Sequence, residues 1–114
     1  MPSLSLDSLP LGRVVVSGPS MAPALRDGEI LLVRWGRPTV PFEVGDVVVI
    51  ELPDRPLGVK RVTRIEDTAV CVEGDNPYAS TDSRVLGPLA LTSVRGRVMC
   101  RLWPRPGRVA ARAG

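Results

Sequence analysis

Short runs of β-branched residues, separated every few positions by glycine or proline, set the strongest limit on the fold of this chain. Its 114 residues include 11 glycines and 12 prolines, which interrupt any long helix. No segment shows a convincing helical spacing of apolar residues, whereas short strands fit between the breaks. The sequence therefore predicts an all-β domain, either a small β-barrel or a folded sheet.

Six segments carry the strand pattern. The run from Val47 to Ile50 is continuously β-branched, which is typical of a strand covered on both faces. Two other segments flank the short turn at Glu66 and Asp67, and this arrangement predicts a hairpin. The segment 74–84 is dense in turn formers and small polar residues and is expected to be an ordered loop. The expected strands are 14–16, 29–35, 47–51, 57–65, 68–73 and 96–103.

The length of the chain indicates one folded unit with a single core. Residues 1–12 are expected to form an N-terminal extension, 13–104 the folded domain and 105–114 a basic flexible tail. No run of about eighteen apolar residues occurs, and the N-terminus lacks the basic start of a signal peptide. The sequence as given therefore predicts neither a membrane span nor export.

The chain contains no histidine, which removes the commonest general base and every Ser-His or Cys-His arrangement. Cys71 and Cys100 lie in apolar strand segments and are expected to be small buried residues. They lack the number and spacing of zinc ligands, and no metal or other cofactor is expected. Any hydrolytic reaction would need a different base.

Ser20 is expected on a sharp corner of the chain. The three valines at 14–16 predict a strand, Gly18 and Pro19 end it, and Pro23 limits any helix that follows. A serine in this position can face a cleft. Serines also commonly close turns or cap a helical turn, and Ser20 taken alone favours that second interpretation.

Lys60 is the only lysine, since the other fourteen of the 15 basic residues are arginine. In a strand Lys60 shares a face with Val62, so it is predicted to point inward while Arg61 points to solvent. Burial lowers the pKa of a lysine, and a neutral amine can take the proton of a serine hydroxyl. Ser20 and Lys60 together would then form the Ser-Lys arrangement of acyl transfer, although one retained lysine can also arise by chance.

Four segments together form a pattern that identifies a protein family more specifically than any one segment does. In chain order they are Ser17–Leu25, Gly45–Val49, Val59–Val62 and Gly74–Arg84. Together they resemble the sequence motifs, called boxes, of the S26 family of serine proteases, the type I signal peptidases and their relatives. The resemblance implies an all-β catalytic domain, with Ser20 as nucleophile and Lys60 as general base. It also implies that the backbone N–H of Ser20 donates to the oxyanion.

The resemblance also implies supporting roles for residues of the fourth segment, Gly74–Arg84. Ser80 would orient the Lys60 amine, because a hydroxyl acceptor fixes a neutral amine without adding a charge. Asp82 and Arg84 would form an ion pair that braces the loop. A loop serine that bonds its own backbone, and an unrelated exposed ion pair, are the structural alternatives for these residues.

Gly18 stands where some family members carry a serine hydroxyl as a second oxyanion donor, so this chain would lack that donor. Met21 and Val15 are expected near the substrate because they flank the nucleophile in the sequence. Both residues are equally explained as part of the core. The family binds an extended peptide as an added strand, with shallow apolar pockets for small side chains near the cut.

Within the family, the chain most resembles the soluble proteases that remove the propeptide of nickel-type superoxide dismutase. It shows neither the transmembrane helices nor the large insertion of membrane-bound signal peptidases, since thirteen residues separate Lys60 from Gly74. The expected partner is a precursor polypeptide, such as that of nickel superoxide dismutase. The expected location is the cytoplasm of a bacterium, with peripheral membrane contact left open.

Three alternatives stay open at this point. The first is a compact type I signal (leader) peptidase that acts on exported preproteins, and the second is a self-cleaving repressor of the LexA type. The third is a non-enzymatic β-barrel binding module that uses its basic C-terminal end, where six arginines after residue 84 meet no acid. No nucleic-acid partner is expected, because a solvated basic end explains these arginines better.

Overall fold

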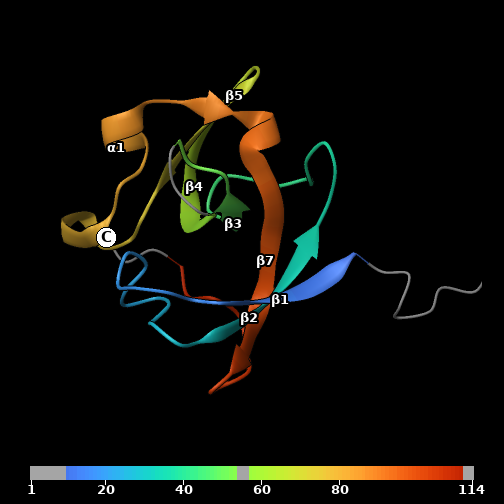
Figure 1. Cartoon of the computed structure of the whole chain (residues 1–114), viewed down its shortest axis with the longest axis vertical. Helices are drawn as coiled ribbons and strands as arrows, with labels where there is room; N and C mark the ends of the chain where they lie inside the picture. Colours follow the sequence, from blue (N-terminus) through green and yellow to red (C-terminus); the bar gives the residue numbers. More distant parts are fainter. Residues whose placement is uncertain (1–9, 54–56, 112–114) are drawn as a thin grey trace, which may run out of the picture.

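The computed structural model describes residues 10–53 and 57–111, in which seven antiparallel strands form one coiled sheet (Figure 1). The strands follow one another across the sheet in the order β1-β2-β7-β3-β4-β5-β6. This arrangement confirms the predicted all-β class. The strands are β1 Leu11–Val15, β2 Ile30–Trp35, β3 Val47–Ile50, β4 Gly58–Glu66, β5 Ala69–Glu73, β6 Leu89–Ala90 and β7 Val94–Trp103.

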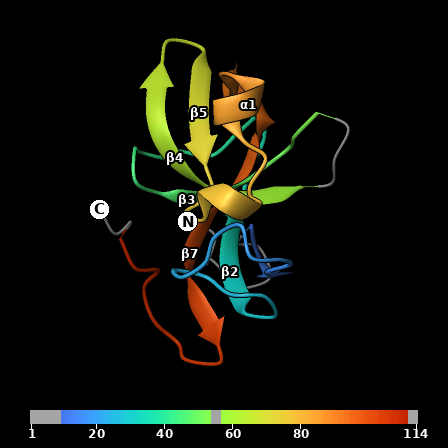
Figure 2. The same ribbon diagram turned by 90° about the vertical axis from the view of Figure 1, so that its left-hand side faces the viewer.

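The six predicted strands all correspond to strands of the structure, and β4 and β5 form the predicted hairpin. The loop after β5 is more regular than predicted. It contains the 3-10 turn η2 Pro77–Ala79 and leads into the short helix α1 Ser83–Leu86, and a second 3-10 turn, η3 Leu91–Ser93, follows β6. Figure 2 shows α1 beside β5, where it covers one side of the sheet. The segment between β5 and β7 is therefore folded onto the sheet.

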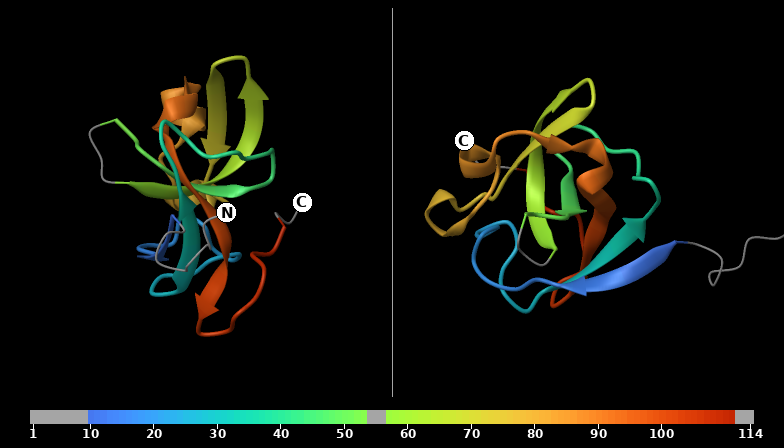
Figure 3. Two further views of the ribbon diagram at one scale, coloured as in Figure 1. Left: turned by 90° about the vertical axis from the view of Figure 1, so that its right-hand side faces the viewer. Right: turned by 45° about the horizontal axis from the view of Figure 1, so that its top comes forward.

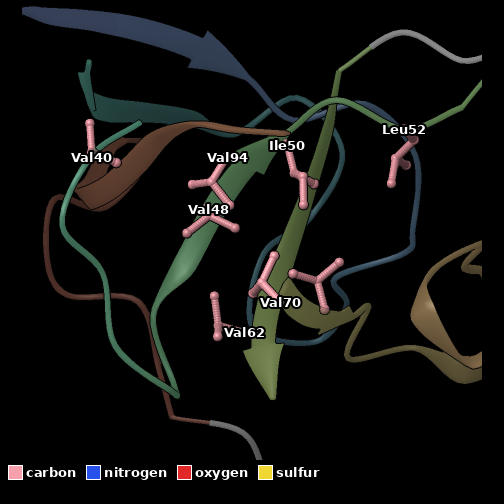
Figure 4. Packing of buried hydrophobic residues seen from close by; sticks show 8 residues of the cluster. Val40, Val48, Ile50, Leu52, Val62, Val70 and Val94 are labelled. Carbon is pink, nitrogen blue, oxygen red and sulfur yellow. The ribbon is translucent and has the colours of Figure 1, made fainter. Parts of the chain in front are cut away.

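The core consists of two clusters that share β3. Val48 and Ile50 point into the first core cluster, whereas Val47 and Val49 point into the second, so all four residues of β3 are buried. The continuous β-branched run is explained by this double coverage, as predicted. The first core cluster (Figure 4) comprises Val40, Val48, Ile50, Leu52, Val62, Val70, Val72 and Val94, and the second comprises Val16, Met21, Leu25, Leu31, Val33, Val47 and Val49.

After β7 the chain turns back on itself. Arg101 and Gly107 exchange two backbone hydrogen bonds of 2.8 and 3.0 Å, and Val109 packs against the second core cluster. Figure 3 shows this segment, in red, returning from the end of β7 toward the middle of the domain. The described part of the segment predicted as a flexible tail thus contacts the domain. Of the predicted extension 1–12, residues 1–9 lie outside the described residues, and Leu11 and Gly12 belong to β1.

Cys71 lies in β5 and Cys100 in β7, and both are free thiols that are half-buried rather than fully buried. In the part of the chain that the structure describes, no helix has the length and apolar character needed to cross a membrane.

Candidate active site

A cleft of about 310 Å³ brings Ser20 and Lys60 together. It lies between the end of β1 with the turn after it, the strands β3 and β4, and the loop around η2. Clefts of this size, lined mostly by apolar side chains with a few polar groups, are typical of ligand and substrate sites. The lining residues are Val14, Val15, Ser17, Ser20, Val49, Leu52, Leu57, Gly58, Val59, Lys60, Ala79 and Thr81.

Ser20 lies on a tight turn, residues 17–22, that begins directly after β1. Gly18 has a φ of +83°, a conformation that favours glycine, and its N–H donates to Asp27 Oδ1 at 2.8 Å. The N–H of Ala22 donates to the carbonyl of Pro19 at 3.0 Å.

The loop after β5 holds the same turn from the other side. The N–H of Asn76 donates to the Ser20 carbonyl at 2.9 Å, and its side-chain Nδ2 donates to the Pro19 carbonyl at 3.2 Å. Gly74 lies so close that a Cβ there would come within 2.5 Å of the Ser20 carbonyl oxygen. Glycine is therefore needed at position 74 for close approach of the two backbones.

Lys60 points inward from β4, as predicted, with only 5% of its surface exposed. Its Nζ donates to Ser80 Oγ at 2.9 Å. The Ser80 hydroxyl in turn donates to Asp82 Oδ2 at 2.6 Å. Because the hydroxyl proton of Ser80 is directed to a carboxylate, a lone pair of Ser80 Oγ is available to the Lys60 amine.

Asp82 is fully buried and forms the N-cap of α1. Burial alone would raise the pKa of Asp82, but hydrogen bonds from the side chains of Arg84 and Ser80 and from the Gly74 N–H outweigh it. The pKa of this carboxyl group is therefore held well below its usual range. The ion pair between Asp82 and Arg84 is present, as the sequence predicts, and it keeps Asp82 charged beside Ser80.

Asp82→Asn is expected to lower the free energy of unfolding by about 2 kcal/mol or more at pH 7, because Arg84 would lose a buried ionic partner. Since the pKa of Asp82 is lower in the folded than in the unfolded chain, its contribution is fully present above about pH 4 and declines as the pH falls from there through the folded-state pKa. Urea unfolding at pH 7 and pH 3 measures both effects. The difference in stability between the two chains should be smaller at pH 3 than at pH 7 but still present, because Asp82 stays charged in the folded chain at pH 3. A difference that is larger at pH 3 than at pH 7 would contradict this assignment.

Arg61 does not point to solvent, and that prediction is wrong. Its side chain is 6% exposed, and its guanidinium holds both carboxylate oxygens of Asp75, with Nε to Oδ1 at 3.0 Å and Nη2 to Oδ2 at 2.9 Å. Nη1 also donates to the Gly45 carbonyl at 3.0 Å. The reason is that other segments cover both faces of β4 here, so a two-residue period does not separate buried from exposed residues.

Val15 and Met21, the two residues expected near the substrate, have different surroundings. Val15 lines the cleft and is 62% exposed. Met21 is 1% exposed, packs in the second core cluster and does not line the cleft. Met21 therefore occupies the core position that the sequence allowed as the second explanation, and its side chain anchors the turn that carries Ser20.

Several residues that shape the site were missed from the sequence. Asp27 accepts the Gly18 N–H, and Asn76, which lies in a segment predicted only as a loop, donates to the carbonyls of Ser20 and Pro19. Their contacts join segments that are distant in the sequence. The only signal for them was their presence in turn-rich stretches near the proposed motifs.

Comparisons with known proteins agree on a class of proteases. Residues 6–99 match the family described as Peptidase S24-like. The chain is 36% identical over 118 residues to mitochondrial inner membrane protease subunit 1 of Xenopus tropicalis, covering 82% of this chain and 71% of that protein. It is 30% identical to the human subunit 1, covering 82% and 70% of the two chains. It is 33% identical to mitochondrial ATP-independent inner membrane protease subunit 1a of Arabidopsis thaliana, covering 78% and 68%.

These relatives contradict the predicted location. The sequence led us to expect a protein of the bacterial cytoplasm, and that prediction is wrong because the relatives are named as subunits of mitochondrial inner membrane proteases. None of these three relatives is named as a maturation protease of nickel superoxide dismutase. The names of the relatives therefore agree better with the signal-peptidase interpretation than with the maturation protease of nickel superoxide dismutase.

Proposed function

Because the chain belongs to the Peptidase S24-like family and is a peptidase by that membership, we propose that it is a serine endopeptidase with Ser20 as nucleophile and Lys60 as general base. The observation that carries the proposal is the shared cleft, in which both side chains take part. The bond from Lys60 to Ser80 supports it, since it fixes an amine at the cleft wall. The chain has no histidine to serve as an alternative base.

In this mechanism the neutral Lys60 amine takes the proton of Ser20 Oγ, and the oxygen attacks the scissile carbonyl carbon of the substrate. The backbone N–H of Ser20 donates to the oxyanion that forms. Lys60 then gives its proton to the leaving amine, and the acyl-enzyme remains on Ser20. Lys60 next takes a proton from water, whose oxygen attacks the ester carbon, and the bond from that carbon to Ser20 Oγ breaks. Lys60 gives the proton to Ser20 Oγ, which restores the serine and the neutral amine and releases the acid.

Ser80 and Asp82 would position the base in each step. Ser80 accepts one N–H of Lys60 and donates its own proton to Asp82, so the orientation of the hydroxyl is fixed. With one N–H held by this fixed acceptor, the lone pair of the amine can be oriented toward the cleft. Asp82 acts only through Ser80, and its charge is stabilised by Arg84.

The proposed substrate is the N-terminal leader of a precursor polypeptide. β1 is an edge strand of the sheet, and its end lines the cleft with Val14 and Val15. An extended peptide can pair with such an edge while small side chains enter the apolar cleft. The names of the relatives favour a signal-peptidase type of leader removal over the processing of a nickel superoxide dismutase precursor.

Incubation of the purified chain with two synthetic precursors tests this proposal. One carries a leader that ends in alanine, and the other is the N-terminal region of a nickel superoxide dismutase precursor. Cleavage after the alanine, located by mass spectrometry, is expected, and a phenylalanine in its place should slow cleavage by about tenfold or more. Cleavage of the dismutase precursor alone would favour the maturation-protease function over the signal-peptidase function. Cleavage of neither precursor would favour a binding module.

A further inference from the structure

We propose that the segment Gly107–Ala110, here called the C-terminal clasp, is a positioning element for the Ser20 turn and acts through Arg61 and Asp75. The inference rests on the proposed function of Ser20 as the nucleophile. It assigns a catalytic contribution to a segment whose composition alone suggests a flexible end. Two separate sets of contacts carry it, one at the Arg61 side chain and one at the second core cluster.

The first set of contacts meets at the Arg61 guanidinium. Besides its bonds to Asp75 and Gly45, Arg61 donates from Nη2 to the Ala110 carbonyl at 2.8 Å. The side chains of Arg61 and Asp75 are only 6% and 4% exposed. A buried ion pair is stable only where its remaining donors find acceptors, so the Ala110 carbonyl completes the hydrogen bonding of this pair.

The pair continues to the nucleophile through one peptide unit. Asp75 is followed by Asn76, whose backbone and side chain hold the carbonyls of Ser20 and Pro19. A shift of Asp75 would therefore move the groups that fix the Ser20 turn. The path from Ala110 through Arg61, Asp75 and Asn76 to Ser20 is a continuous series of hydrogen bonds and covalent links, which is the kind of network that transmits a displacement.

The second set of contacts joins the clasp to the core. Val109 packs against the second core cluster, which contains Met21, the residue directly after Ser20. The clasp is held in place by the paired backbone bonds between Arg101 and Gly107. Arg101 also donates to the Ala24 carbonyl at 3.5 Å, just beyond the turn. The clasp thus contacts the core cluster that contains Met21 and, through Arg61 and Asp75, the loop that holds the Ser20 turn.

Two shortened chains test the role of the clasp. One ends after Pro106 and lacks the clasp, and the control ends after Ala111 and keeps it. The rate at which a fluorophosphonate labels Ser20 reports on the nucleophile without peptide recognition, while kcat and KM are measured with the alanine leader peptide. Loss of the clasp should reduce the labelling rate and kcat by about tenfold to a hundredfold, with KM changed by less than about threefold, because misplacement by a fraction of an ångström affects the reaction more than binding.

A second variant keeps the test valid if the shortened chain does not fold. Val109→Ala retains the whole chain and the Ala110 carbonyl but weakens the packing of the clasp. The labelling rate should fall by about threefold or more, which is less than in the shortened chain. Circular dichroism should show that the fold is intact. Equal labelling and kcat in a folded clasp variant and its control would overturn the inference alone. No labelling of Ser20 in the control chain would overturn the proposed function, and the inference with it.

Discussion

Ser20→Ala is expected to abolish peptide cleavage, with a loss of roughly 10⁴-fold or more in kcat, while the domain stays folded. The substitution removes the proposed nucleophilic oxygen. It retains the backbone groups that shape the turn, since Asn76 donates to the Ser20 carbonyl rather than to its side chain. Steady-state cleavage of the alanine leader peptide measures the loss, and urea unfolding shows whether the stability is unchanged.

Ser17→Ala is the matched control, because Ser17 lines the same cleft and belongs to the same turn. Its removal should change kcat by less than about threefold, as expected for a side chain outside the reacting groups. If Ser20→Ala cleaved the peptide as well as Ser17→Ala did, another residue would have to be the nucleophile. Loss of activity in both variants, with altered unfolding, would instead indicate a general disruption of the turn.

Lys60→Arg is expected to lower kcat by about a thousandfold or more, because the guanidinium stays protonated and cannot act as a base at neutral pH. The change keeps a donor for Ser80 but replaces the neutral amine with a group that stays protonated, so it removes the proton acceptor and retains the hydrogen bond to Ser80. Lys60→Met retains an unbranched apolar side chain in the buried position opposite Val48 and removes the amine altogether. Both variants should be inactive, and the methionine variant should remain folded.

Arg64→Lys provides the control on the same strand. Arg64 is exposed and pairs with Glu66 at the surface, so its exchange should change kcat by less than about twofold. A fully active Lys60→Arg chain would exclude Lys60 as the general base. In that case the buried amine would be a structural partner of Ser80 only.

The strands could be predicted because β-branched runs and glycine or proline breaks act locally. β6 has two residues and α1 has four, which is too short to produce a periodic pattern. The burial of Arg61 was not predictable in the same way, since it depends on which segments cover the second face of β4. A local period describes one strand, whereas coverage is decided by segments far away in the sequence.

The proposed reacting residues of the site were easier to predict than the residues that hold them in position. Ser20 and Lys60 stand out because of residue type, a serine at a broken strand and the only lysine of the chain. Asp27 holds Gly18 through a bond that no motif indicates. The clasp could not be predicted for a related reason, since its small and basic residues suggest a flexible end. Its hydrogen bond, from the buried Arg61 to the Ala110 carbonyl, joins residues that are far apart in the sequence.

The two outer strands of the sheet are unequal, and this has a consequence for solubility. β6 presents only two residues, whereas β1 presents five, with Leu11 and Val15 both exposed. A long apolar edge is a template on which other chains can add strands and aggregate. The edge that the domain would offer to its substrate is therefore also the edge most exposed to self-association, and a bound peptide should act as a solubilising cover for it.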